Sequence, residues 1–147
     1  MEPVVELALR AWEPVFDSMA ELVGPEIFRH LFSDDWRRYQ EADIRRALST
    51  YDVSVAETSD GVAGYVAVDL PTGESHGEIY MVAVAPDQQG RGIGTALTQH
   101  AVSQIRSAGR DLAVVETGGD SGHAAARATY KKAGFVSLPA ERYYLLL

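Results

Sequence analysis

The segment from Glu78 to Gly109 constrains the fold more than any other part of the chain. Residues 79–85 are all apolar (Ile-Tyr-Met-Val-Ala-Val-Ala), which is typical of a strand covered on both faces. Pro86 has no backbone N–H to donate and therefore ends the strand. Three glycines alternate in the turn that follows, at positions 90, 92 and 94. The segment thus predicts a strand, a glycine-rich turn and a helix entered from that turn.

The predicted helix carries one apolar stripe and ends near Gly109, where a glycine cap is common. The stripe consists of Ile93, Leu97, Ala101 and Ile105. A glycine turn at a helix N-terminus presents unpaired N–H groups and the positive end of the helix dipole, a combination that binds phosphate or pyrophosphate. The alternative is a tight strand-to-helix turn that binds no ligand.

The glycine pattern distinguishes among phosphate-binding motifs. A P-loop requires Lys-Ser/Thr after its last glycine, but Thr95-Ala96 follow Gly94. A Rossmann G-x-G-x-x-G motif would need its third glycine where Thr95 or Leu97 stands. The pattern that does match is Gln/Arg-x-x-Gly-x-Gly/Ala, written here as Gln89-Gly90-Arg91-Gly92-Ile93-Gly94. It resembles the coenzyme-A-binding motif of the GCN5-related N-acetyltransferase (GNAT) superfamily.

A second block supports the same resemblance. Residues 116–135 read ETGGDSGHAAARATYKKAGF and are similar to the family's strand-loop-helix segment that ends in Tyr-x-x-x-Gly-Phe. Here that ending is Tyr130-Lys131-Lys132-Ala133-Gly134-Phe135. The two blocks stand in the family's order. The resemblance covers most of residues 50–147, whereas the N-terminal third matches only in helical character.

The resemblance implies an α/β (α+β) fold, a mixed, mostly antiparallel twisted sheet flanked by helices. Family members open with a strand, whereas a helical pattern here begins almost at Met1. Either the first strand is missing, which leaves an exposed sheet edge that a homodimer could cover, or the true start lies upstream. We expect a single domain over residues 1–147, with 1–50 as its helical acceptor side and 51–147 as its cofactor-binding part.

The remaining elements follow from periodicity and turn residues. Residues 1–24 carry an apolar face at helical spacing, with a kink or break expected near Glu13 because Pro14 follows. A second helix is expected over residues 36–49. Gly64 predicts a bulge within a strand. Strands are predicted over residues 52–58, 62–70 and 111–116, with a final antiparallel pair over 135–138 and 142–147.

The resemblance also implies catalytic roles. In this family an amine attacks acetyl-CoA directly, and Tyr130 would protonate the departing thiolate as general acid. Glu78 stands eleven residues before Gln89, the spacing at which the histone-acetylating branch places its glutamate base, and is the first candidate for proton acceptor. Glu116 and then His76 are weaker candidates. The alternative for Tyr130 is a buried aromatic residue that anchors the helix, and the alternative for Glu78 is a solvated carboxylate at the strand end. A water chain in place of a dedicated base is a third alternative.

By the same resemblance, two segments would hold acetyl-CoA as cosubstrate. The strand residues Val82, Ala83 and Val84 would bind the pantetheine arm through their backbone. The turn would bind the pyrophosphate through its amides, with added charge from Arg91; its residues are Gln89, Gly90, Arg91, Gly92, Ile93, Gly94 and Thr95. Tyr130 would lie beside the thioester sulfur. His123 replaces an Asn that contacts pantetheine, and an exposed histidine at the helix start is the alternative.

The acceptor side is less defined. In such folds the first two helices and the final strands frame the acceptor pocket, which nominates Trp36, Arg37, Tyr39 and Tyr143 or Tyr144. Helical spacing makes Trp36 and Tyr39 core candidates instead. Arg127 and Lys131 are candidates for contacts with the nucleotide's phosphates, or else form a solvated cationic face. A small-molecule amine and a peptide amine both stay open as acceptors.

Composition excludes several classes of function. The absence of cysteine excludes disulfides, a thiolate nucleophile and sulfur-ligated zinc, and the histidines lack metal-ligand spacing, so we expect no metal. The net charge of −8 disfavours nucleic-acid binding. No apolar run is long enough to span a bilayer and no signal pattern begins the chain, so we expect a cytoplasmic protein without a membrane partner.

The leading hypothesis is an N-acetyltransferase that moves the acetyl group of acetyl-CoA to a primary amine by direct attack. One alternative is an acyltransferase that uses a longer acyl-CoA. Another is a coenzyme-A-binding sensor or interaction domain without turnover.

Overall fold

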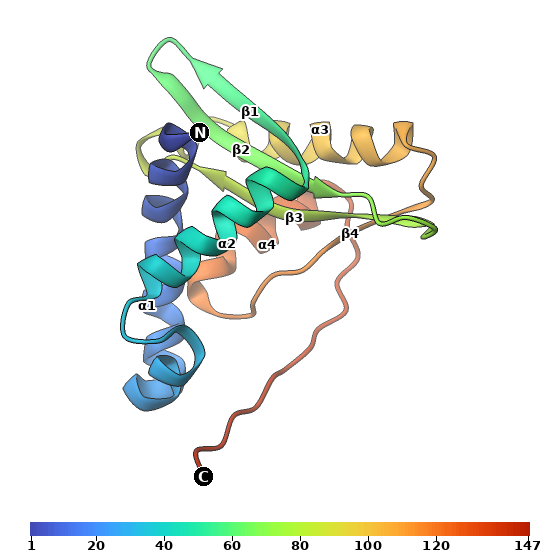
Figure 1. Cartoon of the computed structure of the whole chain (residues 1–147). Helices are drawn as coiled ribbons and strands as arrows, with labels where there is room; N and C mark the ends of the chain where they lie inside the picture. Colours follow the sequence, from blue (N-terminus) through green and yellow to red (C-terminus); the bar gives the residue numbers. More distant parts are fainter.

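The computed structural model describes all 147 residues, and Figure 1 shows its helices arranged around an open sheet. The elements are α1 (Glu2–Phe32), α2 (Trp36–Thr50), β1 (Asp52–Thr58), β2 (Gly61–Asp69), β3 (His76–Val84), α3 (Ile93–Ser107), β4 (Leu112–Val115) and α4 (Ala124–Lys132). Short 3₁₀ turns precede α3 (Pro86–Gln88) and α4 (Ser121–His123). The strand order is β1-β2-β3-β4, antiparallel except that β4 runs parallel to β3. The predicted fold class is confirmed.

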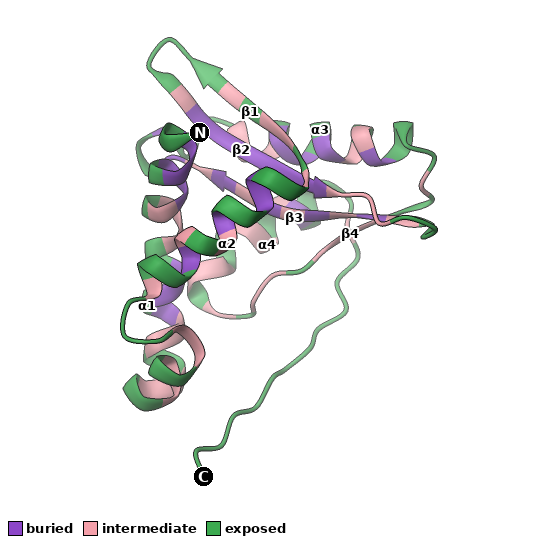
Figure 2. Cartoon of the chain, in the orientation of Figure 1, coloured by how far each residue is buried: buried purple, intermediate pink, exposed green.

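Helices cover both faces of the sheet, and the middle strands carry the core (Figure 2). On one face, α1 and α2 pack over Tyr65, Ala67, Met81 and Ala83. On the other face, α3 packs over Val66, Val68 and Ile79 through the predicted stripe of Leu97, Ala101 and Ile105. The alternating residues of β2 thus reach both clusters, which explains why this strand is apolar on both faces.

A β-bulge in β3 turns Tyr80 toward α2. The pairing of β2 with β3 skips Tyr80, which is therefore the extra residue. Ile79 packs in the α3 cluster, whereas both Tyr80 and Met81 pack in the cluster under α1 and α2. The bulge thereby places a phenol on the α1–α2 face of the sheet, two residues after Glu78.

The irregularity predicted at Gly64 is confirmed. The register of β1 against β2 shifts where Ala63 precedes Gly64. A Cβ atom at Gly64 would lie 2.8 Å from the backbone oxygen of Ala83. Glycine is therefore required here because β2 and β3 approach each other closely.

Of the kink or break expected near Glu13, the break is wrong. Helical dihedral angles continue through Pro14, and the break lies at Gly24, with φ 81° and ψ 165°. Pro14 removes one helical hydrogen bond, but the next two residues, Val15 and Phe16, are buried and hold the helix in place. Gly24 precedes a proline, which disfavours helical angles, and glycine adopts the left-handed region freely.

The predicted final strand pair is also wrong. Residues 136–147 form no strand and make no backbone hydrogen bond, and the chain runs away from the sheet in an extended path (Figure 1). Apolar composition predicts a strand only where a partner edge is present, and here no edge lies alongside. The free edge of β4 is left without a neighbour.

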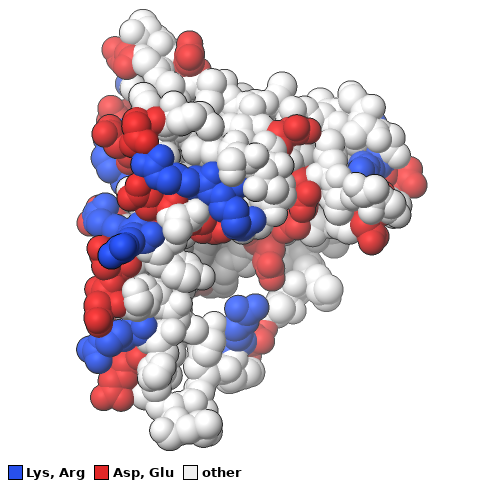
Figure 3. Space-filling model, viewed as in Figure 1, with Lys and Arg blue, Asp and Glu red and all other residues white.

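Charge is distributed unevenly over the surface. On the face shown in Figure 3, cationic side chains gather over α1 and α2 among carboxylates, and α2 alone supplies Arg37, Arg38, Arg45 and Arg46. None of the helices combines the length and the apolar character needed to cross a bilayer.

Candidate active site

The glycine turn connects the end of β3 to the start of α3. Gly90 and Gly92 have φ angles of 79° and 82°, in the left-handed region that favours glycine. The first backbone hydrogen bond of α3 is donated by Ala96 to the Gly92 oxygen, over 3.0 Å. The N–H groups of residues 93–95 precede it and have no acceptor within the protein. They point out of the helix N-terminus, where an anion is stabilised.

Beyond Ile79, the strands β3 and β4 separate. Their parallel pairing ends at Ile79 and Val115. The N–H of Ala85 donates to β2 over 2.8 Å. Because backbone groups alternate in direction along a strand, those of Val82 and Val84 point away from β2, into the opening. The opening is therefore lined by strand groups that lack a partner strand.

A side-chain hydrogen bond joins the glycine turn to the end of β3, and no protein atom lies close to the outer side of the turn. The Gln89 side chain donates to the Val84 oxygen over 3.3 Å. A Cβ atom at Gly90 or Gly92 would meet nothing within 4 Å. Val82, Val84 and the turn residues 89–95 are thus brought together, and they fit an elongated ligand with a diphosphate. Ala83, in contrast, pairs with β2 and is buried.

Tyr130 is the one buried residue of α4. Its ring lies 5.9 Å from that of Phe135, centroid to centroid. Burial raises the pKa of the Tyr130 hydroxyl to about 12. The hydroxyl makes no hydrogen bond within the protein and is not among the fully enclosed polar atoms. It is therefore protonated at neutral pH and free to donate.

Glu78 lies where β3 still pairs with β4, opposite Val114. Its neighbours Gly77 and Ile79 face α3, so Glu78 points to the opposite face, under α1 and α2. Partial burial raises its pKa, and the nearby carboxylates of Asp69 and Glu116 add to the rise. No hydrogen bond or ion pair occupies the Glu78 carboxylate, and none joins it to Tyr130.

His123 is held by Asp120, which the sequence analysis did not single out. The His123 Nδ1 and the Asp120 Oδ1 are 2.5 Å apart, and both side chains are largely buried. Burial opposes ionisation of Asp120, but hydrogen bonds from His123 and Ser18 outweigh it and lower the pKa of that carboxyl. The ionised Asp120 can only accept, so the His123 Nδ1–H donates and Nε2 is left for other contacts. The spacing of three residues between Asp120 and His123, at the start of α4, was the only sequence signal for this pair.

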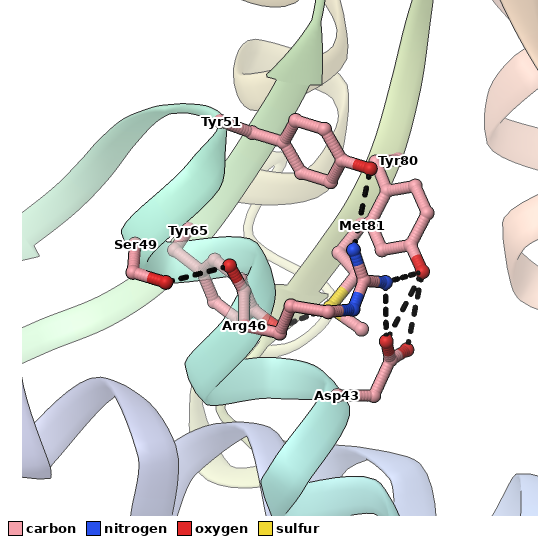
Figure 4. Close-up of polar contacts among 7 residues, drawn as sticks. All are labelled: Asp43, Arg46, Ser49, Tyr51, Tyr65, Tyr80 and Met81. Atoms are coloured by element: carbon pink, nitrogen blue, oxygen red, sulfur yellow. Dashed lines mark hydrogen bonds and ion pairs between the residues drawn. The ribbon is translucent and has the colours of Figure 1, made fainter.

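A polar cluster joins α2 to the bulge in β3 and was also missed (Figure 4). Arg46 donates to Asp43 over 2.6 Å and also to the hydroxyl of Tyr80. The Tyr80 hydroxyl donates to Asp43 over 3.1 Å, and Tyr51 completes the group at 3.4 Å from Arg46. We call these four residues the α2–β3 cluster. It lies on the same face of the sheet as Glu78, and the bulge that brings Tyr80 into it has no sequence signature.

Of the residues nominated for the acceptor pocket, Trp36, Arg37 and Tyr39 make packing contacts, whereas Tyr143 and Tyr144 do not. Trp36 stacks on Phe16 at 4.4 Å between ring centroids, and Arg37 lies over the Trp36 ring. Tyr39 contacts Phe32, while Tyr143 and Tyr144 belong to the exposed chain after α4.

Arg127 is occupied by the loop before α4. It donates to the backbone oxygens of Gly118 and Asp120, over 2.7 and 2.6 Å. Arg127 therefore fixes the loop that carries Asp120. No group of three or more His, Asp or Glu side chains is placed to hold a metal ion.

Comparisons with known proteins agree with this geometry. The family model described as acetyltransferase (GNAT) family matches residues 12–135. A mycothiol acetyltransferase from Tsukamurella paurometabola is 48% identical over 135 residues, which is 89% of this chain and 42% of that protein. The chain spans less than half the length of each such curated relative.

Two solved structures extend the comparison. A GNAT-family acetyltransferase from Desulfovibrio desulfuricans is 28% identical with a TM-score of 0.58, covering 90% of this chain and 80% of its own. A Bacillus subtilis acetyltransferase solved in complex with CoA is 26% identical with a TM-score of 0.56, covering 63% and 59%. With a family model that matches most of its length, the chain belongs to the GNAT acetyltransferase family.

Proposed function

We propose that the protein is an N-acetyltransferase that transfers the acetyl group of acetyl-CoA to a primary amine. The observation that carries the proposal is a line of backbone groups without a strand or helix partner: those of Val82, the N–H of Val84, and the N–H groups of residues 93–95 at the start of α3. Such a line fits a strand-like pantetheine arm followed by a diphosphate. The CoA complex of the B. subtilis relative supports the same choice of ligand.

Two side chains would transfer the protons of the reaction, one from the amine and one to the departing sulfur. The amine nitrogen forms a bond to the acetyl carbon while the carbon–sulfur bond breaks. Glu78, with its free carboxylate and raised pKa, accepts the proton from the amine. Tyr130, with a protonated and unpaired hydroxyl, donates a proton to the departing sulfur. His123 would contact the ligand through Nε2, because Asp120 holds Nδ1.

The acceptor is proposed to be a small-molecule amine. Relatives that align with most of this chain are named mycothiol acetyltransferases, and mycothiol is a small molecule. The α2–β3 cluster and Glu78 supply polar groups on the face where such an acceptor would dock. A peptide amine is the competing choice.

Calorimetric titration with acetyl-CoA tests the ligand. Gly94 has ordinary backbone angles, and a Cβ there would lie 3.7 Å from Val84, so the fold accommodates a side chain. Gly94→Glu should weaken binding by about 100-fold or more, since it sets a carboxylate against the diphosphate. Gly94→Ala is the matched control and should bind like the wild type. Absence of binding by the folded wild type would refute the proposal.

Turnover assays separate the remaining functions. A screen of small and peptide amines, in which the release of free CoA is measured, should identify an amine that the protein acetylates. Binding without turnover on any amine would favour a CoA-binding sensor. Faster turnover with a longer acyl-CoA would favour the broader acyltransferase.

A further inference from the structure

A buried carboxylate–imidazole pair lies where the loop after β4 enters α4. The His123 Nδ1 and the Asp120 Oδ1 are 2.5 Å apart, and the two side chains are 15% and 7% exposed. The backbone N–H of Gly122 donates to the other carboxylate oxygen of Asp120 over 3.1 Å. Both oxygens of Asp120 therefore have partners, and the imidazole is held through Nδ1.

The surrounding backbone is shaped around this pair. A Cβ atom at Gly118 would lie 2.7 Å from the His123 Nδ1. One at Gly122 would lie 2.9 Å from the Pro14 oxygen in α1. The buried Ser18 hydroxyl, also in α1, accepts from the Gly122 N–H over 3.2 Å. Glycine at both positions therefore lets the pair pack against α1 in one fixed arrangement, as a functional site requires.

The other imidazole nitrogen is free. Burial raises the pKa of the Asp120 carboxyl, but hydrogen bonds from His123 and Ser18 outweigh burial and lower it, so Asp120 is ionised. A carboxylate can only accept, so in the neutral ring Nδ1 carries the hydrogen and Nε2 presents a lone pair. No hydrogen bond within the protein uses Nε2, and this atom is not among the fully enclosed polar atoms. Nε2 can therefore accept a proton from a bound molecule.

The pair lies at the end of α4 that adjoins α1. The turn Ser121–His123 contacts α1, whereas α4 contacts α3. The Trp12 ring of α1 lies edge-to-face with His123, at 6.5 Å between ring centroids, and packs against the core cluster under α1 and α2. Tyr130 comes seven residues after His123, and its ring lies against Phe135, which packs in the α3 cluster. Tyr130 is thus about 10 Å further along α4, toward α3.

The reaction proposed above needs a second proton acceptor. A primary amine is an ammonium ion at neutral pH, and its nitrogen keeps one hydrogen in the amide product. The nitrogen therefore loses two protons, one before it attacks and one after its bond to the acetyl carbon has formed. Glu78 accounts for the first. Tyr130 gives its hydrogen to the sulfur and regains one of these two protons, and the other is released to water.

We propose that His123 accepts the second proton through Nε2, and that Asp120 is a positioning residue that keeps His123 in the accepting tautomer. This inference rests on the proposed N-acetyltransferase function. Glu78 points to the side under α1 and α2, and His123 adjoins that side through Trp12. Tyr130 stands toward α3. The two proton acceptors therefore lie on the side of the amine, and the proton donor lies on the side of the thiol.

Nuclear magnetic resonance tests the tautomer without any turnover. In ¹⁵N-labelled protein without ligand, at mildly alkaline pH, long-range ¹H–¹⁵N spectra should show His123 with its hydrogen on Nδ1. Asp120→Asn should shift the population toward hydrogen on Nε2, because an Asn amide can donate to Nδ1. His123→Gln identifies the signal among the four histidines. A wild-type His123 with its hydrogen on Nε2 would overturn the proposal.

Turnover of the amine identified by the screen tests the coupling within the pair. His123→Gln and Asp120→Asn should each lower kcat about 10-fold, and the double variant should lose no more, because Asp120 acts only through His123. The dissociation constant of acetyl-CoA should stay within about 3-fold in all three variants. His100→Gln is the matched control and should turn over like the wild type, since His100 contacts Ser54 on β1.

The kinetic outcomes distinguish this inference from the proposed function. Losses that multiply to about 100-fold in the double variant would overturn the positioning role of Asp120. A His123→Gln variant as fast as the wild type, or one that fails to bind acetyl-CoA, would overturn the inference alone. No turnover of any amine by the wild type would refute the proposed function and this inference with it.

A weakly basic acceptor separates the two proton acceptors. A fluorinated analogue of the identified amine that is neutral at the assay pH needs no first proton transfer. With this analogue, Glu78→Gln should lose less than about 3-fold in kcat, whereas His123→Gln should still lose about 10-fold. The reverse pattern would overturn the proposal.

Discussion

The two sides of the candidate site are built from different parts of the protein. The proposed CoA side consists of backbone groups from one continuous segment, residues 82–95, whose shape depends on Gly90 and Gly92 at positive φ. The proposed acceptor side consists of side chains that come from separate elements, with Arg46 and Tyr80 thirty-four residues apart in the chain. A backbone site follows from local conformation, whereas a side-chain site requires the helices to pack correctly on the sheet. Substitutions on the two sides should therefore fail differently, in binding on one side and in turnover on the other.

Tyr130→Phe should have the largest effect on turnover. The substitution keeps the ring that packs on Phe135 and removes only the proton donor. We expect kcat to fall by about 10²- to 10³-fold, as is typical for loss of a general acid. The dissociation constant of acetyl-CoA, measured by calorimetry, should stay within about 3-fold, because backbone groups carry the binding. A kcat close to that of the wild type would reduce Tyr130 to a packing residue.

Glu78→Gln should have the next largest effect and a distinct pH signature. A base works only when ionised, so wild-type activity should fall as the pH drops through the pKa of Glu78, which burial and Asp69 raise above its ordinary value. The variant should lose about 10- to 100-fold in kcat/KM at neutral pH, together with that acidic limb. A full acidic limb in the variant would assign the proton acceptor to another group, with Glu116 as the first alternative.

The contrast between the two sides also explains what the sequence could predict. Glycine spacing and the apolar run predicted the strand, turn and helix start over residues 79–94 correctly, because positive φ and burial leave a local signature. The α2–β3 cluster left no such signature, since Tyr80 reaches α2 only through a bulge. Asp120 was missed for a similar reason, as its role depends on the burial of His123.

The chain after α4 shows the opposite error. The apolar residues 143–147 suit a strand, so the sequence predicted one, but a strand forms only where the segment lies alongside a free edge. Pro14 was misjudged because packing around Val15 and Phe16 outweighs its local helix-breaking tendency. In both cases tertiary context decided the outcome.

Arg46→Met should affect the acceptor side alone, and more mildly. Arg46 holds Asp43 and Tyr80 in place, but it is about half exposed, so its hydrogen bonds are partly screened. With the amine identified by the screen, we expect KM for that amine to rise about 3- to 10-fold with little change in kcat. Arg45→Met is the matched control on the same helix, because Arg45 pairs with Glu2 and Glu41 away from the cluster. If both substitutions raised KM equally, the effect would come from the general loss of positive surface charge and not from the cluster.

Asp69→Asn should have the smallest effect, visible only in the pH profile. Asp69 pairs with Glu78 across β2 and β3, and its negative charge opposes ionisation of the Glu78 carboxyl. Neutralising it should lower the pKa of Glu78, so the acidic limb of kcat/KM moves to lower pH while the rate on the neutral plateau is unchanged. The exposed Asp60→Asn variant, in the β1–β2 turn, serves as control and should leave the limb in place. Calorimetry should find acetyl-CoA binding unaltered in both variants. A limb that stays fixed in Asp69→Asn while Glu78→Gln abolishes it would mean that burial, the largest cause, and Glu116 set the pKa of the base without Asp69.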